Sequence, residues 1–289
     1  MTTLQAPAPV PTVTRVAQFR ASAWLRPQML FAYVVLGAWI IVLVGVQWIA
    51  PFDPLVASGA RLSPPSGEHL LGTDSLGRDV FSRTLYGARE SLPIALAAIV
   101  GAVAIGCALG AIAGFFGGWV DAVIMRFADI TMAFPAILLA MAVAAALGPG
   151  LQNALIAIVA VWWPIYARLT RGQVLSIKQR EHVEAATAIG SGRWRTLGKH
   201  ILPHSATPIM VNATMDLGQI ILLVASLSFL GLGALPPSPE WGAMITDGSK
   251  NFYQPWIAAA PGIAMVSVTL AMNFLGDGLR DAFDVKGRR

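Results

Sequence analysis

The sequence predicts an all-α integral membrane protein with six transmembrane helices. Hydrophobic residues make up 56% of the 289-residue chain and charged residues only 12%, a balance far from that of a soluble globular domain. Uncharged apolar runs recur along the chain, and each is near the roughly 20 residues that span a bilayer core as a helix. These runs occupy residues 29–50, 91–119, 130–147, 151–167, 217–235 and 256–276.

The distribution of Lys and Arg predicts the orientation of these helices. With a cytoplasmic N-terminus, 15 of the 20 Lys and Arg residues fall on the inner side of the membrane. The remaining five, on the outer side, are Arg61, Arg78, Arg83, Arg89 and Lys250. Because cytoplasmic loops carry the excess of positive charge, both termini are predicted to be cytoplasmic. The formal charge of +5 is explained by contact with anionic lipid and requires no nucleic acid partner.

The N-terminal part of the chain is expected to hold one helix and a long outer segment. Residues 1–28 form a cytoplasmic tail, and residues 29–50 form an uncleaved first transmembrane helix, because this run is too long for a signal peptide. The prolines of "PFDP" end the helix. Residues 51–90 follow on the extracytoplasmic side, and their last part, "GRDVFSRTLYGARESL", places its apolar residues on one helical face. This pattern predicts an amphipathic helix at the outer membrane interface.

Residues 91–277 are expected to form a core of five helices. Short links, "GFFGGWVD" and "LGPG", join the second helix to the third and the third to the fourth, so consecutive helices are antiparallel neighbours. Small residues line the second helix, which permits close helix contact in a membrane. Pro135 in the third helix favours a static kink over a gating hinge. Residues 278–289 form a basic cytoplasmic tail.

A polar stretch between the fourth and fifth helices, "EHVEAATAIGSGRWRTLGKHILP" (residues 181–203), interrupts the apolar chain. Gly190 suits the left-handed residue that ends a helix, and Ser191 is expected to cap a second short helix. Pro203 is expected to break that helix before the membrane resumes. Most loops of this kind only connect helices. A structured loop over residues 171–206 with an exposed tryptophan is better explained as a docking surface for a partner.

The same stretch resembles the EAA motif of permease subunits in ATP-binding-cassette importers. That motif reads EAA, three residues, Gly, nine residues, Ile, one residue and Leu-Pro. The positions in register here are Glu184, Ala185, Ala186, Gly190, Leu202 and Pro203. His200 occupies the isoleucine position, a departure that affects the local packing before the fifth helix.

Three further stretches narrow the resemblance to the oligopeptide, dipeptide and nickel permease group, C-type subunit. They are "HLLGTDSLGRDVFSRTLYGARESL", "GGWVDAVIMRFADITMAFPAILLA" and "SFLGLGALPPSPEWGAMI". With the EAA motif they follow in order along the chain, so the resemblance covers about Arg26 to Phe283. Val224 stands where many members of the group carry a glutamate.

The resemblance implies a type I ABC importer permease (MetI-like) fold and a place in an ATP-driven importer of dipeptides or oligopeptides. The polar loop would seat on an ATPase subunit, with Glu184 making polar contacts, the alanines allowing close approach and Gly190 setting the turn. The implied partners are a homologous second permease subunit, two cytoplasmic ATP-binding subunits, an extracytoplasmic substrate-binding protein and membrane lipid. Nickel, opine or glutathione are alternative substrates in the same family. A secondary transporter without ATPases is the rival function, although no inverted repeat supports it.

Polar residues inside apolar helices are candidates for the transport pathway. Arg126 and Asp129, one helical turn apart, predict an intramembrane ion pair, and a structural role is favoured over a transport role. Asp216, with Gln219 beside it in the fifth helix, either lines the pathway or pairs with a group of a partner subunit.

The sequence predicts no catalytic site and no bound cofactor. It contains no Gly-rich phosphate loop ending in Lys-Ser or Lys-Thr, so hydrolysis of ATP with Mg is assigned to the partner subunits. It contains neither G-x-S-x-G nor H-E-x-x-H. His200 and His204 stand four residues apart without a third ligand nearby, and the single Cys107 cannot form an intramolecular disulfide. No metal site is therefore expected.

Overall fold

The computed structural model describes residues 26–283. The predicted N-terminal tail up to residue 25, and the predicted basic tail from residue 284, lie outside the described residues. The described chain is helical, apart from loops and an isolated β-bridge between Thr73 and Asp79, so the predicted all-α fold is confirmed. Its helices are α2 (Pro27–Ile49), α3 (Val80–Phe116), α4 (Gly118–Met132), α5 (Ala136–Leu147), α6 (Leu151–Lys178), α7 (Glu181–Ala188), α8 (Arg193–Arg195), the π-helix η1 (Thr196–Ile201), α9 (Leu202–Phe229), α10 (Trp241–Lys250) and α11 (Trp256–Phe283).

Five helical segments of the described chain are long and apolar enough to cross a membrane. They are α2, α3, α6, the continuous helical segment from Arg193 to Phe229 that contains α9, and α11. The pair of α4 and α5 passes the same test together but bends by 94° at the break between the two helices. Counted as one broken span, this pair completes the six helices that the sequence predicts.

The bend between α4 and α5 lies at Pro135, which is the N-cap residue of α5. Proline has no backbone N–H to donate, and it disfavours helical geometry in the residue before it, so α4 ends ahead of it. The kink predicted at Pro135 is confirmed, and it is sharp enough to divide the predicted third helix in two.

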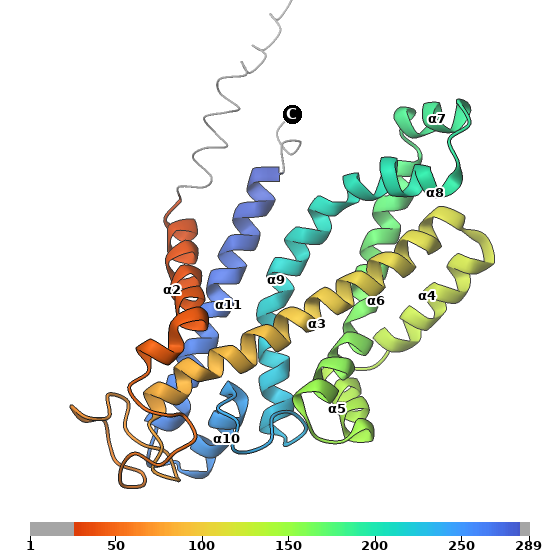
Figure 1. The fold of residues 1–289 in the computed structure, drawn as a ribbon. Coiled ribbons are helices and arrows are strands. Elements are labelled where there is room, and N and C mark those ends of the chain that lie inside the picture. Colours follow the sequence, from red (N-terminus) through yellow and green to blue (C-terminus); the bar gives the residue numbers. More distant parts are fainter. Residues whose placement is uncertain (1–25, 284–289) are drawn as a thin grey trace, which may run out of the picture.

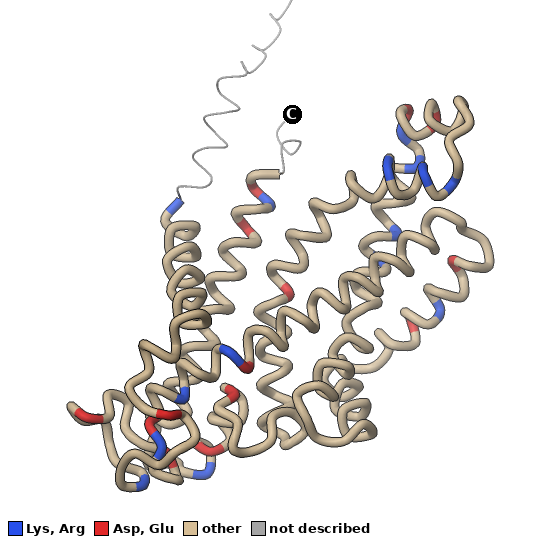
Figure 2. Tube along the Cα trace, in the orientation of Figure 1, with Lys and Arg blue, Asp and Glu red and all other residues tan. Residues whose placement is uncertain are grey.

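The loops and short helices gather at two opposite ends of the helical bundle (Figure 1). The start of α2, the end of α11 and the short helices α7 and α8 lie at one end of the molecule, and residues 51–79 with α10 lie at the other. Charged residues gather near these two ends, and the helical stretches between them are mostly uncharged (Figure 2). We call residues 51–79 and α10 the cap, and residues 181–201 (α7, α8 and η1) the protrusion.

The start of α3 differs from the amphipathic interfacial helix that the sequence predicts. Residues 80–90 do not form a separate amphipathic helix, because they are the first turns of the continuous helix α3. Asp79 caps this helix by accepting a hydrogen bond from the Ser82 backbone N–H at 2.7 Å. Arg83 is only 4% exposed, and its guanidinium donates to the carbonyl oxygens of Pro54 at 2.7 Å and Ser238 at 3.3 Å. The first turns of α3 are therefore buried under the cap.

Helices α3 and α6 pack closely along a row of glycines. Gly106, Gly110 and Gly114 are spaced four residues apart and so lie on one face of α3. A Cβ atom at Gly106 would lie 2.4 Å from the carbonyl oxygen of Trp163, and one at Gly110 would lie 2.2 Å from that of Ala167. Both distances are far inside van der Waals contact, so only glycine permits this approach of the two backbones.

Replacing Gly110 by alanine is expected to destabilise the fold. The new Cβ would meet the backbone of α6 rather than a movable side chain, so the helices must separate at a cost of about 1–3 kcal/mol. The matched control is Gly172→Ala on α6, where no atom lies within 4 Å of the added Cβ. Thermal unfolding in detergent should give a lower midpoint for Gly110→Ala and an equal or higher midpoint for Gly172→Ala. Equal midpoints for both variants would contradict close packing at Gly110.

Candidate functional site

The first half of the protrusion is a two-turn helix that ends at a glycine. Helix α7 carries both of its acids, Glu181 and Glu184, in the first turn, where they favour the positive end of the helix dipole. Gly190 has a φ of +85°, which confirms the predicted left-handed position. The Gly190 N–H donates to the Thr187 carbonyl and the Ser191 N–H to the Ala186 carbonyl, both at 3.0 Å. This pair of bonds is the Schellman motif, which satisfies the last carbonyls of α7.

The second half of the protrusion differs from the prediction at two residues. Ser191 does not cap the next helix: Gly192 is the N-cap residue of α8, and the Ser191 hydroxyl accepts a hydrogen bond from Thr196 at 3.2 Å. Pro203 does not break the helix either, since the chain runs through η1 into α9. Proline removes one backbone donor and its ring crowds the carbonyl four residues earlier. The turn accordingly widens to a π-helix, in which the Leu202 N–H donates to the Leu197 carbonyl.

The protrusion is packed onto the C-terminal ends of α3 and α6 by a hydrophobic cluster separate from the main core. Its buried members are Ala111, Val174, Ile177, Val183, Leu197 and Ile201, with Phe115 and Leu202 packed against them. The cluster thus contains residues of α3, α6, α7, η1 and α9. The protrusion is therefore held to α3 and α6 by side-chain packing as well as by the chain itself.

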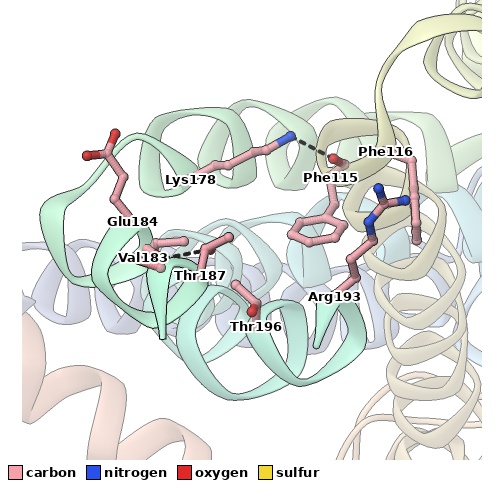
Figure 3. A pocket seen from close by; sticks show the side chains of 9 residues that line it. Phe115, Phe116, Lys178, Val183, Glu184, Thr187, Arg193 and Thr196 are labelled. Atoms are coloured by element: carbon pink, nitrogen blue, oxygen red, sulfur yellow. Dashed lines mark hydrogen bonds between the residues drawn. The ribbon is translucent and has the colours of Figure 1, made fainter. Parts of the chain in front are cut away.

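A groove of about 600 Å³ lies between the protrusion and the end of α3 (Figure 3). It is lined by Phe115, Phe116, Lys178, Val183, Glu184, Thr187, Ala188, Arg193 and Thr196. The Lys178 ammonium donates to the Phe115 carbonyl at 2.8 Å and lies 5.3 Å from the centre of its ring. Glu184 stands at the edge of the groove, and its side chain is exposed.

The residues in register with the EAA motif divide between the surface and the interior. Those at the surface are Glu184, Ala185 and Gly190 of the protrusion and Pro203 of α9, all exposed. Ala186 is buried and Leu202 is half-buried against the hydrophobic cluster. Only one of the two alanines is therefore free for close approach by a partner. The other packs inside this chain.

Aromatic residues extend the exposed surface of the protrusion. Trp194 is 67% exposed, and its ring contacts that of Phe116 edge-on at a centroid distance of 5.3 Å. Ile189, next to the glycine turn, is 87% exposed. The sequence analysis did not predict that the groove is lined by Phe115, Phe116 and Lys178. The two adjacent phenylalanines before the glycine turn are the feature of the sequence that could have indicated it. Apolar side chains this exposed are typical of an interaction surface.

The predicted ion pair between Arg126 and Asp129 is wrong. Asp129 pairs instead with Arg168 of α6, with 2.5 Å between Oδ1 and Nη2. Nearby, Arg171 of α6 makes a bidentate contact with Asp121 of α4, at 2.5 and 2.6 Å. Because α4 packs along α6, its acids find partners across the two helices rather than one turn along their own helix.

The other predicted pathway residues lie halfway along α9. Asp216 is half-buried, and its Oδ2 atom accepts hydrogen bonds from the Tyr166 hydroxyl at 2.7 Å and the Trp162 indole at 3.2 Å. Gln219 is exposed on the same helix. Within residues 26–283, no group of three His, Cys, Asp or Glu side chains is placed to hold a metal ion.

A fully buried acid at the cap, Glu240, holds α10 in place. Glu240 is fully buried, caps α10 by accepting from the Ala243 N–H at 2.9 Å, and accepts from the Ser91 hydroxyl at 3.1 Å. Burial raises the pKa of the Glu240 carboxyl above its usual range, and hydrogen bonds from the α10 backbone and from serines partly offset this rise.

Comparisons with known proteins agree with this architecture. Residues 106–289 match the family model described as "Binding-protein-dependent transport system inner membrane component". A chain of the MetNI methionine ABC transporter, in an inward facing conformation, superposes with a TM-score of 0.55 at 20% identity, covering 67% of this chain and 93% of that chain. This likeness confirms the predicted permease fold.

Curated relatives cover nearly the whole chain. The dipeptide transport system permease protein DppC of Alkalihalophilus pseudofirmus is 48% identical over 257 residues, covering 86% of this chain and 84% of the relative. The probable D,D-dipeptide transport system permease protein DdpC of Escherichia coli is 43% identical over 263 residues, covering 90% and 88%. The glutathione transport system permease protein GsiD of Pectobacterium atrosepticum is 43% identical over 270 residues, covering 91% and 90%. The chain therefore belongs to the family of binding-protein-dependent transport system inner membrane components, as a multi-pass membrane permease.

Proposed function

We propose that this chain is a permease subunit of an ATP-driven peptide importer and couples to its ATPases through the protrusion. The observation that carries the proposal is the protrusion itself, which exposes Glu184, Gly190 and Trp194 while its other side is packed on α3 and α6. A loop that only connects α6 to α9 needs neither this anchoring cluster nor exposed aromatic residues. The protrusion and both termini face the cytoplasm, and the cap faces outward.

The proposed complex contains two permease subunits. A homologous second permease forms the other half of the pathway, and two cytoplasmic subunits bind and hydrolyse ATP with Mg. An extracytoplasmic substrate-binding protein delivers the substrate to the cap, and lipid surrounds the apolar helices. This chain supplies no ATPase site, because its sequence contains no phosphate-binding loop.

The anchoring of the protrusion suggests how ATP binding opens the pathway. When two ATPases close on ATP, they move the protrusions of the two permeases toward each other. The hydrophobic cluster passes this movement to α3 and α6, whose glycine contact holds the two helices together. The two permeases then rock relative to each other between inward and outward states, each selected by the ligand that binds it better.

The proposed substrates are short peptides. Two of the relatives carry dipeptide names at 48% and 43% identity. Glutathione is the second candidate, because the permease GsiD of an Escherichia coli strain is 46% identical over 250 residues.

Reversing the charge of Glu184 tests the docking role of the protrusion. Glu184→Lys should lower both the amount of ATPase that co-purifies and ATP-dependent peptide uptake by about tenfold or more, since reversing a charge at a desolvated contact costs about 2 kcal/mol or more. Glu181→Lys is the matched control: Glu181 lies in the same first turn of α7 but does not line the groove. Uptake into vesicles and co-purification are measured for both variants.

If Glu184→Lys transports and binds ATPases as the wild type does, the protrusion is a mere connection. Uptake by the wild type without ATP or ATPases would instead support a secondary transporter.

Removing the contact between Phe116 of α3 and Trp194 of the protrusion tests whether movement passes from the protrusion to α3. Phe116→Ala removes the edge-on ring contact, worth about 0.5–1.5 kcal/mol beyond its buried area, and changes no residue of α7. ATP hydrolysis by the complex should continue, while the number of peptides imported per ATP falls. Phe127→Ala on α4, where the phenylalanine is 62% exposed and outside this contact, should keep the wild-type ratio. An unchanged ratio in Phe116→Ala would show that the contact plays no part in coupling.

A further inference from the structure

Polar residues recur on one face of α9 between Asn212 and Ser226, with Leu223 among them. Asn212, Asp216, Gln219 and Ser226 fall within about 80° of one another around a helix of 3.6 residues per turn. Asn212 and Gln219 are exposed, and Asp216 and Ser226 are half-buried. Lipid cannot satisfy the hydrogen bonds of amide and carboxylate groups, so this polar face turns toward water or toward protein in the assembled transporter.

Asp216 is held in one orientation by its contacts with α6. Both donors, the Tyr166 hydroxyl and the Trp162 indole, bond to the same carboxylate atom, Oδ2, at 2.7 and 3.2 Å. The side chains that donate are themselves buried, at 0% and 8% exposure, so they cannot easily turn away. No hydrogen bond within residues 26–283 reaches Oδ1.

No positive charge of the described chain neutralises Asp216. The ion pairs found within residues 26–283 involve other acids, and the two donors to Asp216 are neutral groups. A carboxylate at the middle of a membrane helix is costly unless a cation or water reaches it. The acid therefore needs water or a positively charged group from outside the described chain.

We propose that Oδ1 of Asp216 binds the protonated amino group of the substrate as it crosses the membrane. The inference rests on the proposed peptide import, and it names the substrate group that this site recognises. An ammonium group has three donors and no acceptor, which suits a carboxylate oxygen that has none of its hydrogen bonds made. Asn212 and Gln219, on either side along the same face, offer amide groups to the polar backbone of a short peptide.

A fixed cation on the second permease is the competing occupant. In that case Asp216 would hold the two permeases together, and its neutralisation would weaken their assembly. A substrate that passes through must be bound more weakly than a permanent partner, because a transport site has to release its ligand. The single hydrogen-bond acceptor left free on Asp216 fits a transient contact better than a permanent bidentate pair.

The test uses the complete complex in proteoliposomes, with radiolabelled dialanine as the probe. The binding protein is supplied saturated with dialanine, so its own recognition of the amino group does not limit the rate. Asp216→Asn keeps the shape of the side chain and an oxygen that can accept from Tyr166 and Trp162, and removes only the charge. Saturating uptake should fall about tenfold or more, while the second permease co-purifies in the wild-type amount.

Moving the charge distinguishes a binding role from a structural one. Adding Gln219→Asp to Asp216→Asn restores a carboxylate on the same face and should recover part of the uptake. Adding Thr214→Asp instead places it on the opposite face of α9 and should recover none.

Wild-type uptake by Asp216→Asn, loss of the second permease, or equal recovery from both second-site changes would each overturn the inference. So would the absence of recovery from Gln219→Asp. A wild-type complex that imports no dialanine with ATP would contradict the proposed function itself.

Discussion

The close contact of α3 with α6 is the constraint on which the rest of the molecule depends. The glycines at positions 106 and 110 bring the two backbones so near that a single added methyl group would overlap a carbonyl oxygen. Lipid provides no hydrophobic force between helices, so their attraction comes from such close packing along the contact. The two helices then serve as a common support: α4 is joined to α6 by ion pairs, α9 packs on both, and the protrusion rests on their C-terminal ends.

At the opposite end of α3, buried polar contacts join this helix to the cap. Ser75 donates to Asp247 of α10 at 2.7 Å, and the Trp241 indole donates to the Thr84 carbonyl of α3 at 2.9 Å. Arg83 is buried between Asp74 and the backbone carbonyls of Pro54, in the cap, and Ser238, in the loop before α10. Opening the cap would leave these buried polar groups without partners, at a cost of several kcal/mol, about 3–5 for a broken buried ion pair alone. Large movements during transport are therefore expected between this chain and a second permease, rather than within its own bundle.

The sequence predicts the helices well where one residue type decides the local structure. Apolar runs locate the spans, Gly190 marks the left-handed turn, and Pro135 marks the bend, because each of these effects acts over a few neighbouring residues. The failures concern partners that lie far apart in the sequence. The sequence pairs Asp129 with Arg126 because the two lie one helical turn apart, whereas in the fold Asp129 pairs with Arg168, 39 residues away. The charges of residues 121–129 interrupt the apolar run, so the sequence predicts a third span that begins only at residue 130, whereas ion pairs to α6 allow α4 to carry its two acids.

At the widened turn η1, the local effect of Pro203 is outweighed by packing against residues that are distant in the sequence. Pro203 is a helix breaker in isolation, and the sequence alone therefore predicted an end to the helix there. In the folded chain, Leu197 and Ile201 on this turn are buried in the hydrophobic cluster, so a break would expose them. Burying a large aliphatic side chain is worth about 1.5–3 kcal/mol, which exceeds the loss of one backbone hydrogen bond, worth about 1 kcal/mol. The chain accordingly keeps its helix and accommodates the proline by widening one turn, and this preserves a continuous helical connection from the protrusion to Asp216 in the middle of α9.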